Sequence, residues 1–435
     1  MQSFLNKLRE DVLFRAGILY LTAALINASL PFFALPLIIR SMSPEDFGHV
    51  GVYLALVNVA TILVGFGTNG IISVVHFRDG VNAVASYIIA ELRLLVITTG
   101  IITLVSIVFI DSLELVTGLP RKWIWIAGLT AVWQFINSIG LAVFQSRSFP
   151  VRYASIQIGI TSGWTIVSLI LICVFEFGWV GRAIGQTISV SVVGGITLLH
   201  LLGLNSLNQN RKGVRLGELL RFGIPLLPHS LAGALMVSSD RVILSNLSSA
   251  NSVGLYYAAF QICSIITLVA AAINQAWVPW LYKRLATALE KDKIEIVQKT
   301  YILYSLILIM AAFVTIFAPL IILKIAGEKY SAAIPIARWL APAAAFSGMY
   351  YFVTNYLFYS NKTGVLSVIT VGVAVLQTAM LFVIVPRMGI HGAAISTFIA
   401  SFLYWLVTWC LAQKITPMPW GGAIIRGRKN EKQRG

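Results

Sequence analysis

LPLIIRSMSPEDFGHVGVYLALVNVATILVGFGTNGIISVVHFR, residues 35–78, joins two apolar runs through a short polar turn. The first run ends at Arg40, and the second run begins at Phe47 and ends at the basic Arg78. A bilayer accommodates such runs as helices, because each backbone polar group must then be paired within its own segment. The stretch therefore predicts a helical hairpin that crosses a membrane.

A weaker copy of this stretch occurs about 206 residues later, in VILSNLSSANSVGLYYAAF, which begins at Val242. The pairs that align at this offset are Ser43 with Ser249, Gly48 with Gly254, and Arg78 with Arg284. Internal repeats in a chain with many spans are typical of two-lobed transporters whose site lies between the lobes.

The amino-acid composition also indicates a membrane protein. The 435 residues are 58% hydrophobic and 11% charged, with a mean hydropathy of +0.85. These values exclude a soluble globular domain of this size and indicate an integral membrane protein. The net charge of +16 is explained by the usual cytoplasmic excess of Lys and Arg in membrane proteins, or in part by an anionic substrate.

Twelve apolar runs each approach the roughly 20 residues that a bilayer core requires. Their predicted limits are 15–39, 48–74, 86–110, 122–145, 153–175, 179–202, 222–247, 253–278, 300–323, 331–358, 364–385 and 389–413. With the N-terminus inside, the cytoplasmic segments hold about 22 basic residues and the outer segments about 6. This asymmetry predicts that both termini are cytoplasmic.

The longest polar interruption in the first two-thirds of the chain divides these spans into two sets of six. We predict an N-terminal six-helix bundle over 1–203, a cytoplasmic linker over 204–221, a C-terminal six-helix bundle over 222–413 and a basic cytoplasmic tail over 414–435. The fold class is an all-α polytopic membrane protein with two six-helix bundles around a central cavity. An even number of spans per half predicts a parallel repeat.

Three segments carry a family resemblance. They are LPLIIRSMSPEDFGHVGVY, ELLRFGIPLLP and SSDRVILSNLSSANSVGLYYAA. The chain resembles the O-antigen (Wzx-type) polysaccharide flippases, in the superfamily of multidrug, oligosaccharidyl-lipid and polysaccharide exporters. The resemblance covers about residues 15–413 in span count and order, and its motifs are loose.

The resemblance implies a protein of the bacterial inner membrane that moves lipid-linked oligosaccharides from the cytoplasmic to the periplasmic leaflet. The implied partners are a lipid-linked oligosaccharide with an anionic pyrophosphate, membrane lipids, a polysaccharide polymerase and a chain-length regulator. No nucleic acid, cofactor or enzymatic activity is expected.

Two local patterns are interpreted as structural. Gly65-Phe-Gly67-Thr-Asn-Gly70 matches G-x-G-x-x-G, but it lies inside an apolar span, where small residues permit close packing or a bend, and not after a strand. The three cysteines lie in apolar runs and are interpreted as packing residues, so no metal site is predicted.

Ionisable residues inside apolar runs are the candidate functional residues, because each costs about 2.5–3.5 kcal/mol on insertion scales unless it finds a partner or water. Glu91 and Arg93 point to different faces of one helix, and both would lie at the interface if the third span began at Leu92. Arg182 lies near the outer end of the sixth span, where its side chain could reach the surface.

Asp240 and Arg241 lie far along the seventh span, and Arg338 stands between Pro335 and Pro342, where we expect an interrupted helix lining a cavity. The predicted substrate-binding residues are Arg241, Arg338, Arg93 and Arg182, and Glu91 and Asp240 are candidates for ion coupling. Guanidinium groups in a wet cavity would offset the cost of carrying a pyrophosphate through hydrocarbon.

Two alternatives remain at this stage. One is a cation-coupled exporter of small amphiphilic molecules, which needs a carboxylate in the N-terminal bundle, where Glu91 qualifies. The other is a polysaccharide polymerase or ligase, which the short outer loops disfavour.

Overall fold

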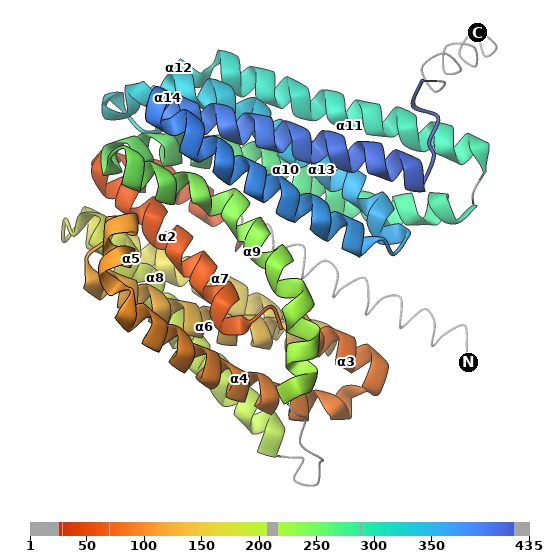
Figure 1. Cartoon of the computed structure of the whole chain (residues 1–435), viewed down its shortest axis with the longest axis horizontal. Helices are drawn as coiled ribbons and strands as arrows, with labels where there is room; N and C mark the ends of the chain where they lie inside the picture. The colour runs from red at the N-terminus through yellow and green to blue at the C-terminus, as the bar shows by residue number, and fades with distance from the viewer. Residues whose placement is uncertain (1–25, 28, 69, 207–215, 288, 422–435) are drawn as a thin grey trace. The chain divides into compact units, whose positions relative to one another are not determined.

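A computed structural model describes residues 26–27, 29–68, 70–206, 216–287 and 289–421. Within these ranges every regular element is helical (Figure 1). A helix over Ser29–Arg40 comes first. It is followed by α2 (Pro44–Gly65), α3 (Ile71–Asp79), α4 (Val81–Val108), α5 (Ile110–Thr117), α6 (Arg121–Ser146), α7 (Pro150–Cys173), α8 (Gly178–Ser206) and α9 (Leu216–Leu247). The remaining elements are α10 (Ala250–Thr287), α11 (Glu290–Ile316), α12 (Ala318–Ile325), η1 (Glu328–Ala333), α13 (Ile334–Tyr359) and α14 (Thr363–Ile415).

The all-α membrane class predicted from the sequence is confirmed. Within the described ranges, nine helices are long and apolar enough to cross a membrane. One of them, α14, is 53 residues long and covers two of the predicted spans. Those two spans meet at Gly389, whose backbone angles of φ 55° and ψ −134° are not helical. Because the left-handed region favours glycine, this residue allows the chain to turn between them.

The predicted hairpin of residues 35–78 is present, but its second span is shorter than expected. Ser43 caps α2 by accepting a hydrogen bond from the Asp46 backbone nitrogen at 3.0 Å. The predicted span 48–74 was wrong in its second half, because α2 ends at Gly65 and Phe66 and Gly67 adopt positive φ. The glycine-rich stretch is therefore a helix break.

Two other predicted spans also differ in detail. The predicted run 300–323 divides at Phe317, between α11 and α12. The interruption expected around Arg338 is absent, since α13 is continuous through Pro342 and Pro335 lies in its first turn. A proline in the first turn breaks no intrahelical hydrogen bond, because its missing N–H would have had no partner there.

The internal repeat is visible in how α2 and α10 begin. Ser249 accepts a hydrogen bond from the Ser252 backbone nitrogen at 3.2 Å, as Ser43 does at the start of α2. One turn later, Gly48 and Gly254 bring the two backbones together. A Cβ added to Gly48 would lie 2.0 Å from the Ala250 carbonyl oxygen, and one added to Gly254 would lie 1.6 Å from that of Pro44. Only glycine fits at both crossing positions.

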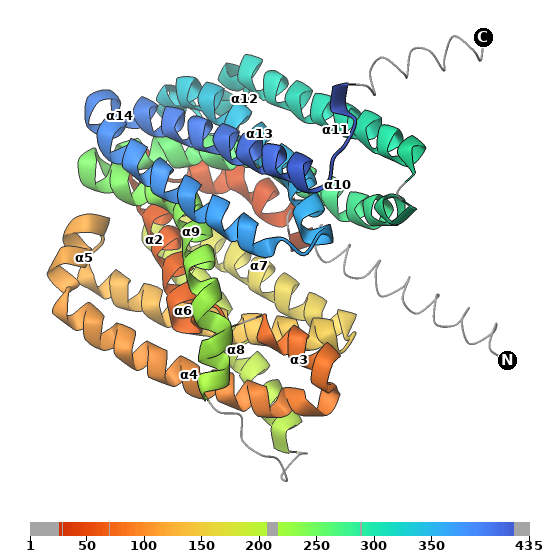
Figure 2. The ribbon, with the colours of Figure 1, turned by 45° about the vertical axis from the view of Figure 1, so that its right-hand side comes forward.

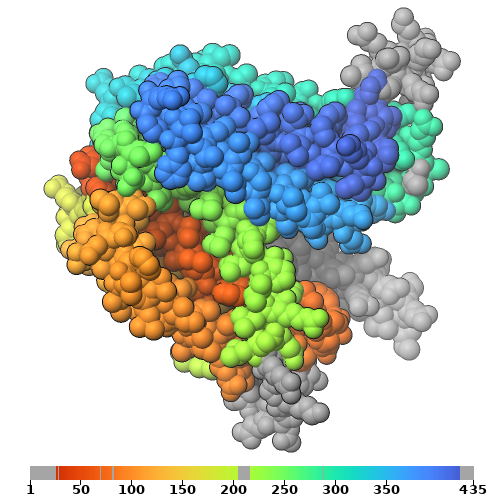
Figure 3. Space-filling model, viewed as in Figure 1, coloured from red at the N-terminus to blue at the C-terminus, as the bar shows by residue number. Residues whose placement is uncertain are grey.

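The chain forms two compact units, residues 1–254 and 255–435, so that the division falls inside α10. In the first unit, α2 is the central helix and packs against α4, α6, α8 and α9. Figure 3 shows α2 recessed between α4–α6 and α9 on one face of this unit. The short α5 forms the bend between α4 and α6 (Figure 2).

In the second unit, α13 packs against α14 and α11. Aromatic rings fill much of this interior: Tyr304 lies 6.3 Å from Phe352 and 6.1 Å from Trp405, and Phe346 lies 5.4 Å from Trp405. These edge and tilted arrangements are the ones that aromatic quadrupoles favour.

The predicted linker is shorter in the structure. Helix α8 continues to Ser206 and α9 begins at Leu216, while residues 207–215 lie outside the described part of the chain. The beginning of the predicted tail is ordered against the second unit. The Trp420 indole donates to Gln413 at 2.7 Å, and Tyr301 donates to the Trp420 carbonyl at 3.0 Å.

Candidate functional site

Glu91 is a fully buried carboxyl on α4. Its exposed fraction is 0%, and neither carboxyl oxygen has a hydrogen-bond partner among the described residues. It is surrounded by the apolar core of the first unit, which includes Ile88, Leu94 and Leu95 on the same helix. Glu91 therefore lies inside the protein and not on its surface.

The Thr68 hydroxyl, at the break after α2, lies next to this carboxyl. Thr68 is itself fully buried and already donates its proton to the Gly65 carbonyl at 2.8 Å. A second hydroxyl, that of Thr98, ties α4 to α2 by donating to the Val64 carbonyl at 2.6 Å. The helix break thus places a polar but occupied group beside Glu91.

This position is energetically unusual. A carboxylate without partners in apolar surroundings is very costly, whereas a carboxyl that takes up a proton or binds a cation avoids that cost. Such a group has little structural use, because a hydrophobic residue would fill the space at no electrostatic cost. Glu91 therefore remains the candidate for ion coupling in the first unit.

Arg182 is the second buried ionisable residue of this unit. Its exposed fraction is 7%, and its guanidinium carbon lies 3.7 Å from the centre of the Trp164 ring. Its Nη1 donates to Gln186 Oε1 at 3.1 Å, one turn later on α8. A cation over an indole is worth about 2 kcal/mol or more when it is desolvated. Arg182 is held inside the bundle and does not extend to the surface.

Three hydroxyl groups form a closed triangle near Arg182. Tyr53 on α2 lies 2.9 Å from Thr130 on α6 and 2.9 Å from Thr187 on α8, and the two threonines lie 2.8 Å apart. The charge of Arg182 acts on the Tyr53 hydroxyl. The triangle connects three helices through polar groups, and each hydroxyl can both donate and accept.

Asp240 and Arg241 are both buried, with exposed fractions of 1% and 5%. Asp240 Oδ1 accepts a hydrogen bond from the Arg241 backbone nitrogen at 2.8 Å. Both residues therefore lie within the packing of α9 in the first unit, where a charge requires partners.

Arg93 and Arg338 are exposed on α4 and α13 respectively. Arg93 follows Glu91 by two residues, so the two side chains leave opposite sides of the helix, as predicted. Arg338 belongs to the second unit and stands beside Trp339, which is 39% exposed.

The structure thus places five of the six predicted residues in the first unit and Arg338 in the second. It does not bring Glu91 and Arg182 into hydrogen-bond contact, since the Glu91 oxygens have no partner in the described chain. Sequence reasoning missed the hydroxyl triangle and Trp164. Each of these residues is a single polar or aromatic side chain in an apolar run. Such a side chain does not indicate a site in the sequence, because its partners lie on other helices.

No group of three or more His, Cys, Asp or Glu side chains suited to a metal ion occurs within the described ranges. Cys173, Cys263 and Cys410 are free thiols. The candidate site consists of buried charged side chains and hydroxyl groups.

Comparison with known proteins identifies the family to which this sequence is similar. Residues 13–285 match the family model described as "Polysaccharide biosynthesis protein". The chain is 22% identical over 411 residues to the "Lsg locus putative protein 1" of Haemophilus influenzae, covering 91% of this chain and 98% of that protein. It is 24% identical over 362 residues to an "Uncharacterized membrane protein" of the same organism, covering 79% and 83%.

Solved structures with the same fold are transporters. An inward-facing multidrug resistance MATE family transporter of the MOP superfamily aligns with a TM-score of 0.65 at 19% identity, covering 90% of this chain and 98% of that chain. An outward-facing one aligns with a TM-score of 0.62 at 18% identity, covering 92% and 95%. This chain therefore shares the fold of these transporters.

Proposed function

Because this chain belongs to the polysaccharide biosynthesis protein family, we propose that it is a flippase for a lipid-linked oligosaccharide. The cargo would be a polyprenyl-pyrophosphate-linked repeat unit of O-antigen or a related polysaccharide, carried from the cytoplasmic to the periplasmic leaflet of a bacterial inner membrane. The proposal is carried by the family match over 13–285, on a chain that has a transporter fold. Both termini would be cytoplasmic, as the distribution of basic residues predicts.

The buried arginines of the first unit suit an anionic cargo. A pyrophosphate cannot enter hydrocarbon as an isolated ion, whereas bidentate hydrogen bonds from guanidinium groups stabilise it strongly. Arg182 is already desolvated beside Trp164, and Arg241 is buried on α9. We propose that these two residues bind the pyrophosphate during passage, with Arg338 and Arg93 attracting it from the surface.

Glu91 would supply the driving force. A buried carboxyl that alternates between a protonated and an ionised form can link cargo movement to a proton gradient, because each form favours a different conformation. Asp240 is a second candidate for this coupling. Alternating access between the two halves is the expected mechanism for an internal repeat of this kind.

The direct test is the location of the cargo. In a host strain that lacks this gene, the lipid-linked repeat unit is expected to accumulate in the cytoplasmic leaflet, where a membrane-impermeant reagent added from outside cannot modify it. Restoring the wild-type gene should return the cargo to the periplasmic leaflet, and Arg241→Ala should restore it poorly at equal expression. Normal periplasmic exposure without the gene would overturn the proposal.

A second function, cation-coupled export of small amphiphilic molecules, is favoured by one observation. The inward-facing and outward-facing structures with this fold are multidrug resistance MATE family transporters, and Glu91 is a carboxyl in the N-terminal half, as that function requires. A deletion strain that becomes sensitive to several cationic drugs, with unchanged surface polysaccharide, would support this function and exclude the flippase.

A further inference from the structure

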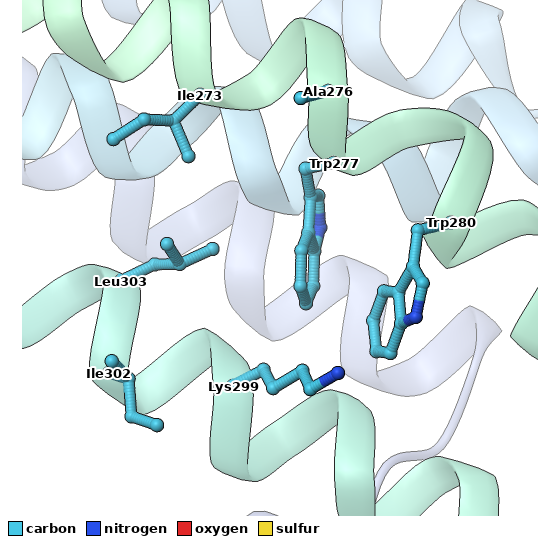
Figure 4. Close-up of a pocket in the computed structure, with 7 residues that line it drawn as sticks. All are labelled: Ile273, Ala276, Trp277, Trp280, Lys299, Ile302 and Leu303. Atoms are coloured by element: carbon cyan, nitrogen blue, oxygen red, sulfur yellow. The ribbon is translucent and has the colours of Figure 1, made fainter.

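A cavity of about 330 Å³ lies in the second unit (Figure 4). It is lined by residues of α10 and α11: Ile273, Ala276, Trp277, Trp280, Lys299, Ile302 and Leu303. Figure 4 shows the two indole rings hanging from α10 toward Lys299, which reaches up from α11. We propose that this cavity binds a membrane phospholipid with an anionic phosphate head group, the phosphate at Lys299 and one acyl chain along α11.

The polar end of the cavity is a cation held in a defined position. Lys299 Nζ lies 4.3 Å from the centre of the Trp280 ring and 2.9 Å from Glu295 Oε1. An ammonium group has three donors, so the bond to Glu295 leaves two that can reach phosphate oxygens. The ion pair and the indole together fix the Lys299 head group before any lipid arrives, which lowers the entropy cost of binding.

The surrounding charge favours an anion. Between Lys283 and Lys299 the chain carries five basic side chains and three carboxylates. Two of those carboxylates, Asp292 and Glu295, pair with Arg284 at 2.5 and 3.3 Å, and Glu295 is shared with Lys299. The remaining basic side chains give this end of the unit a positive surplus. Basic residues near a membrane surface attract anionic lipids with about 1 kcal/mol each.

The apolar end of the cavity continues along an exposed helix face. Ile302 at the cavity is 67% exposed, and the same face of α11 carries Leu306, Ile309, Phe313 and Ile316, which are 43%, 65%, 56% and 69% exposed. Spacings of three and four residues place them in one stripe. In a membrane span such a stripe faces hydrocarbon, so it offers an acyl chain a continuous apolar path from Lys299.

The tryptophan pair marks the depth of the site. Trp277 and Trp280 lie 4.6 Å apart, and tryptophan prefers the boundary between head groups and hydrocarbon. At this boundary the lipid phosphate would lie at Lys299, and its acyl chain would extend from there into the hydrocarbon. The sequence places this end of the unit at the cytoplasmic leaflet, where the surface potential is negative. The proposed lipid site does not depend on the cargo of the transporter.

The test is to titrate phosphatidylglycerol into the purified full-length protein in detergent. Native mass spectrometry measures how much of the protein carries a bound lipid at each concentration. Lys299→Gln is expected to weaken binding about fivefold, the effect of one lost basic contact. Lys283→Gln removes the same charge from an exposed side chain that does not line the cavity, and should change binding less than twofold. Glu295→Gln removes a carboxylate that competes with phosphate for Lys299, while the Trp280 ring still positions the ammonium group, so binding should tighten.

A second pair of variants tests the cavity itself. Ala276→Leu adds bulk inside it and should reduce lipid occupancy, whereas Ala272→Leu adds the same bulk at an exposed position of α10 outside it. Equal loss in Lys299→Gln and Lys283→Gln would overturn the proposal, as it would show a diffuse charge effect. Equal binding of phosphatidylcholine, or of glycerol phosphate without acyl chains, would also overturn it.

Discussion

The two compact units differ in how many ionisable side chains they bury. The first buries Glu91, Arg182, Asp240 and Arg241 within its helices. The second has one buried charge within its described residues, Asp292, and that carboxylate is paired with Arg284 at the end of α10.

The uncharged groups of the two interiors are similar. Tyr53 bonds to Thr130 and Thr187 in the first unit, and the Tyr256 hydroxyl lies 2.9 Å from that of Thr397 in the second. Aromatic pairs occur in both, such as Tyr53 with Trp123 and Tyr304 with Trp405. The units therefore differ in their buried charges and not in their buried hydroxyl groups. Because buried charges cost stability unless they are used, the difference in buried charge supports our proposal that the first unit carries the ion and anion chemistry.

Glu91→Gln should have the largest effect. The amide cannot release a proton at any accessible pH, so the response of transport to a pH gradient should fall by about 5–150-fold, the usual range of a coupling free energy. Flux of lipid-linked oligosaccharide in vesicles with an imposed pH gradient is the measurement. The matched control is Glu114→Gln, on an exposed carboxylate of the same unit. A variant that keeps the wild-type pH response would remove Glu91 from the mechanism.

Arg182→Ala should weaken transport about 10–100-fold, since hydrogen bonds to charged groups contribute about 1.5–3 kcal/mol. Arg182→Lys keeps the charge over Trp164 but loses the bidentate geometry, and it should recover only part of the activity. Flux and thermal stability are measured together. If activity in Arg182→Ala falls only in proportion to the folded fraction, the residue is structural.

Arg338→Ala should have a smaller effect of about fivefold on the apparent affinity for the cargo, the value of one basic contact near a surface. Its stability should stay within about 0.5 kcal/mol of wild type, because the side chain is exposed. Initial flux at several cargo concentrations measures this effect. A loss as large as that of Arg182→Ala would contradict the division between the units.

Tyr53→Phe should have the smallest effect, a loss of about 1 kcal/mol in the free energy of unfolding. The change removes one corner of the hydroxyl triangle, but Thr130 and Thr187 still bond to each other at 2.8 Å. Tyr359→Phe, on a side chain that is 39% exposed, serves as the control. Denaturant titration in detergent compares the two, and equal stabilities would mean that the triangle contributes nothing to packing.

The sequence alone determined the membrane class and the approximate place of the spans. Apolar runs of bilayer length are local signals, and they need no knowledge of what each helix touches. The repeat of Ser43 and Gly48 at Ser249 and Gly254 was visible in the same way, and it corresponds to two equally capped helix starts. At Gly65–Gly70 the sequence left close packing or a bend open, and it did not predict that the helix ends there, because a short glycine-containing run inside an apolar stretch is compatible with a continuous span.

Only the tertiary structure decided which ionisable residues are buried. Glu91 and Arg93 are two residues apart in the same apolar run, yet one is fully buried and the other exposed. Whether each side chain is buried depends on which face of α4 packs against the core, and the neighbouring helices determine that face. The partners of Arg182 were likewise invisible, since Trp164 lies on another helix. Burial is a property of the assembled bundle, whereas hydropathy is a property of the chain.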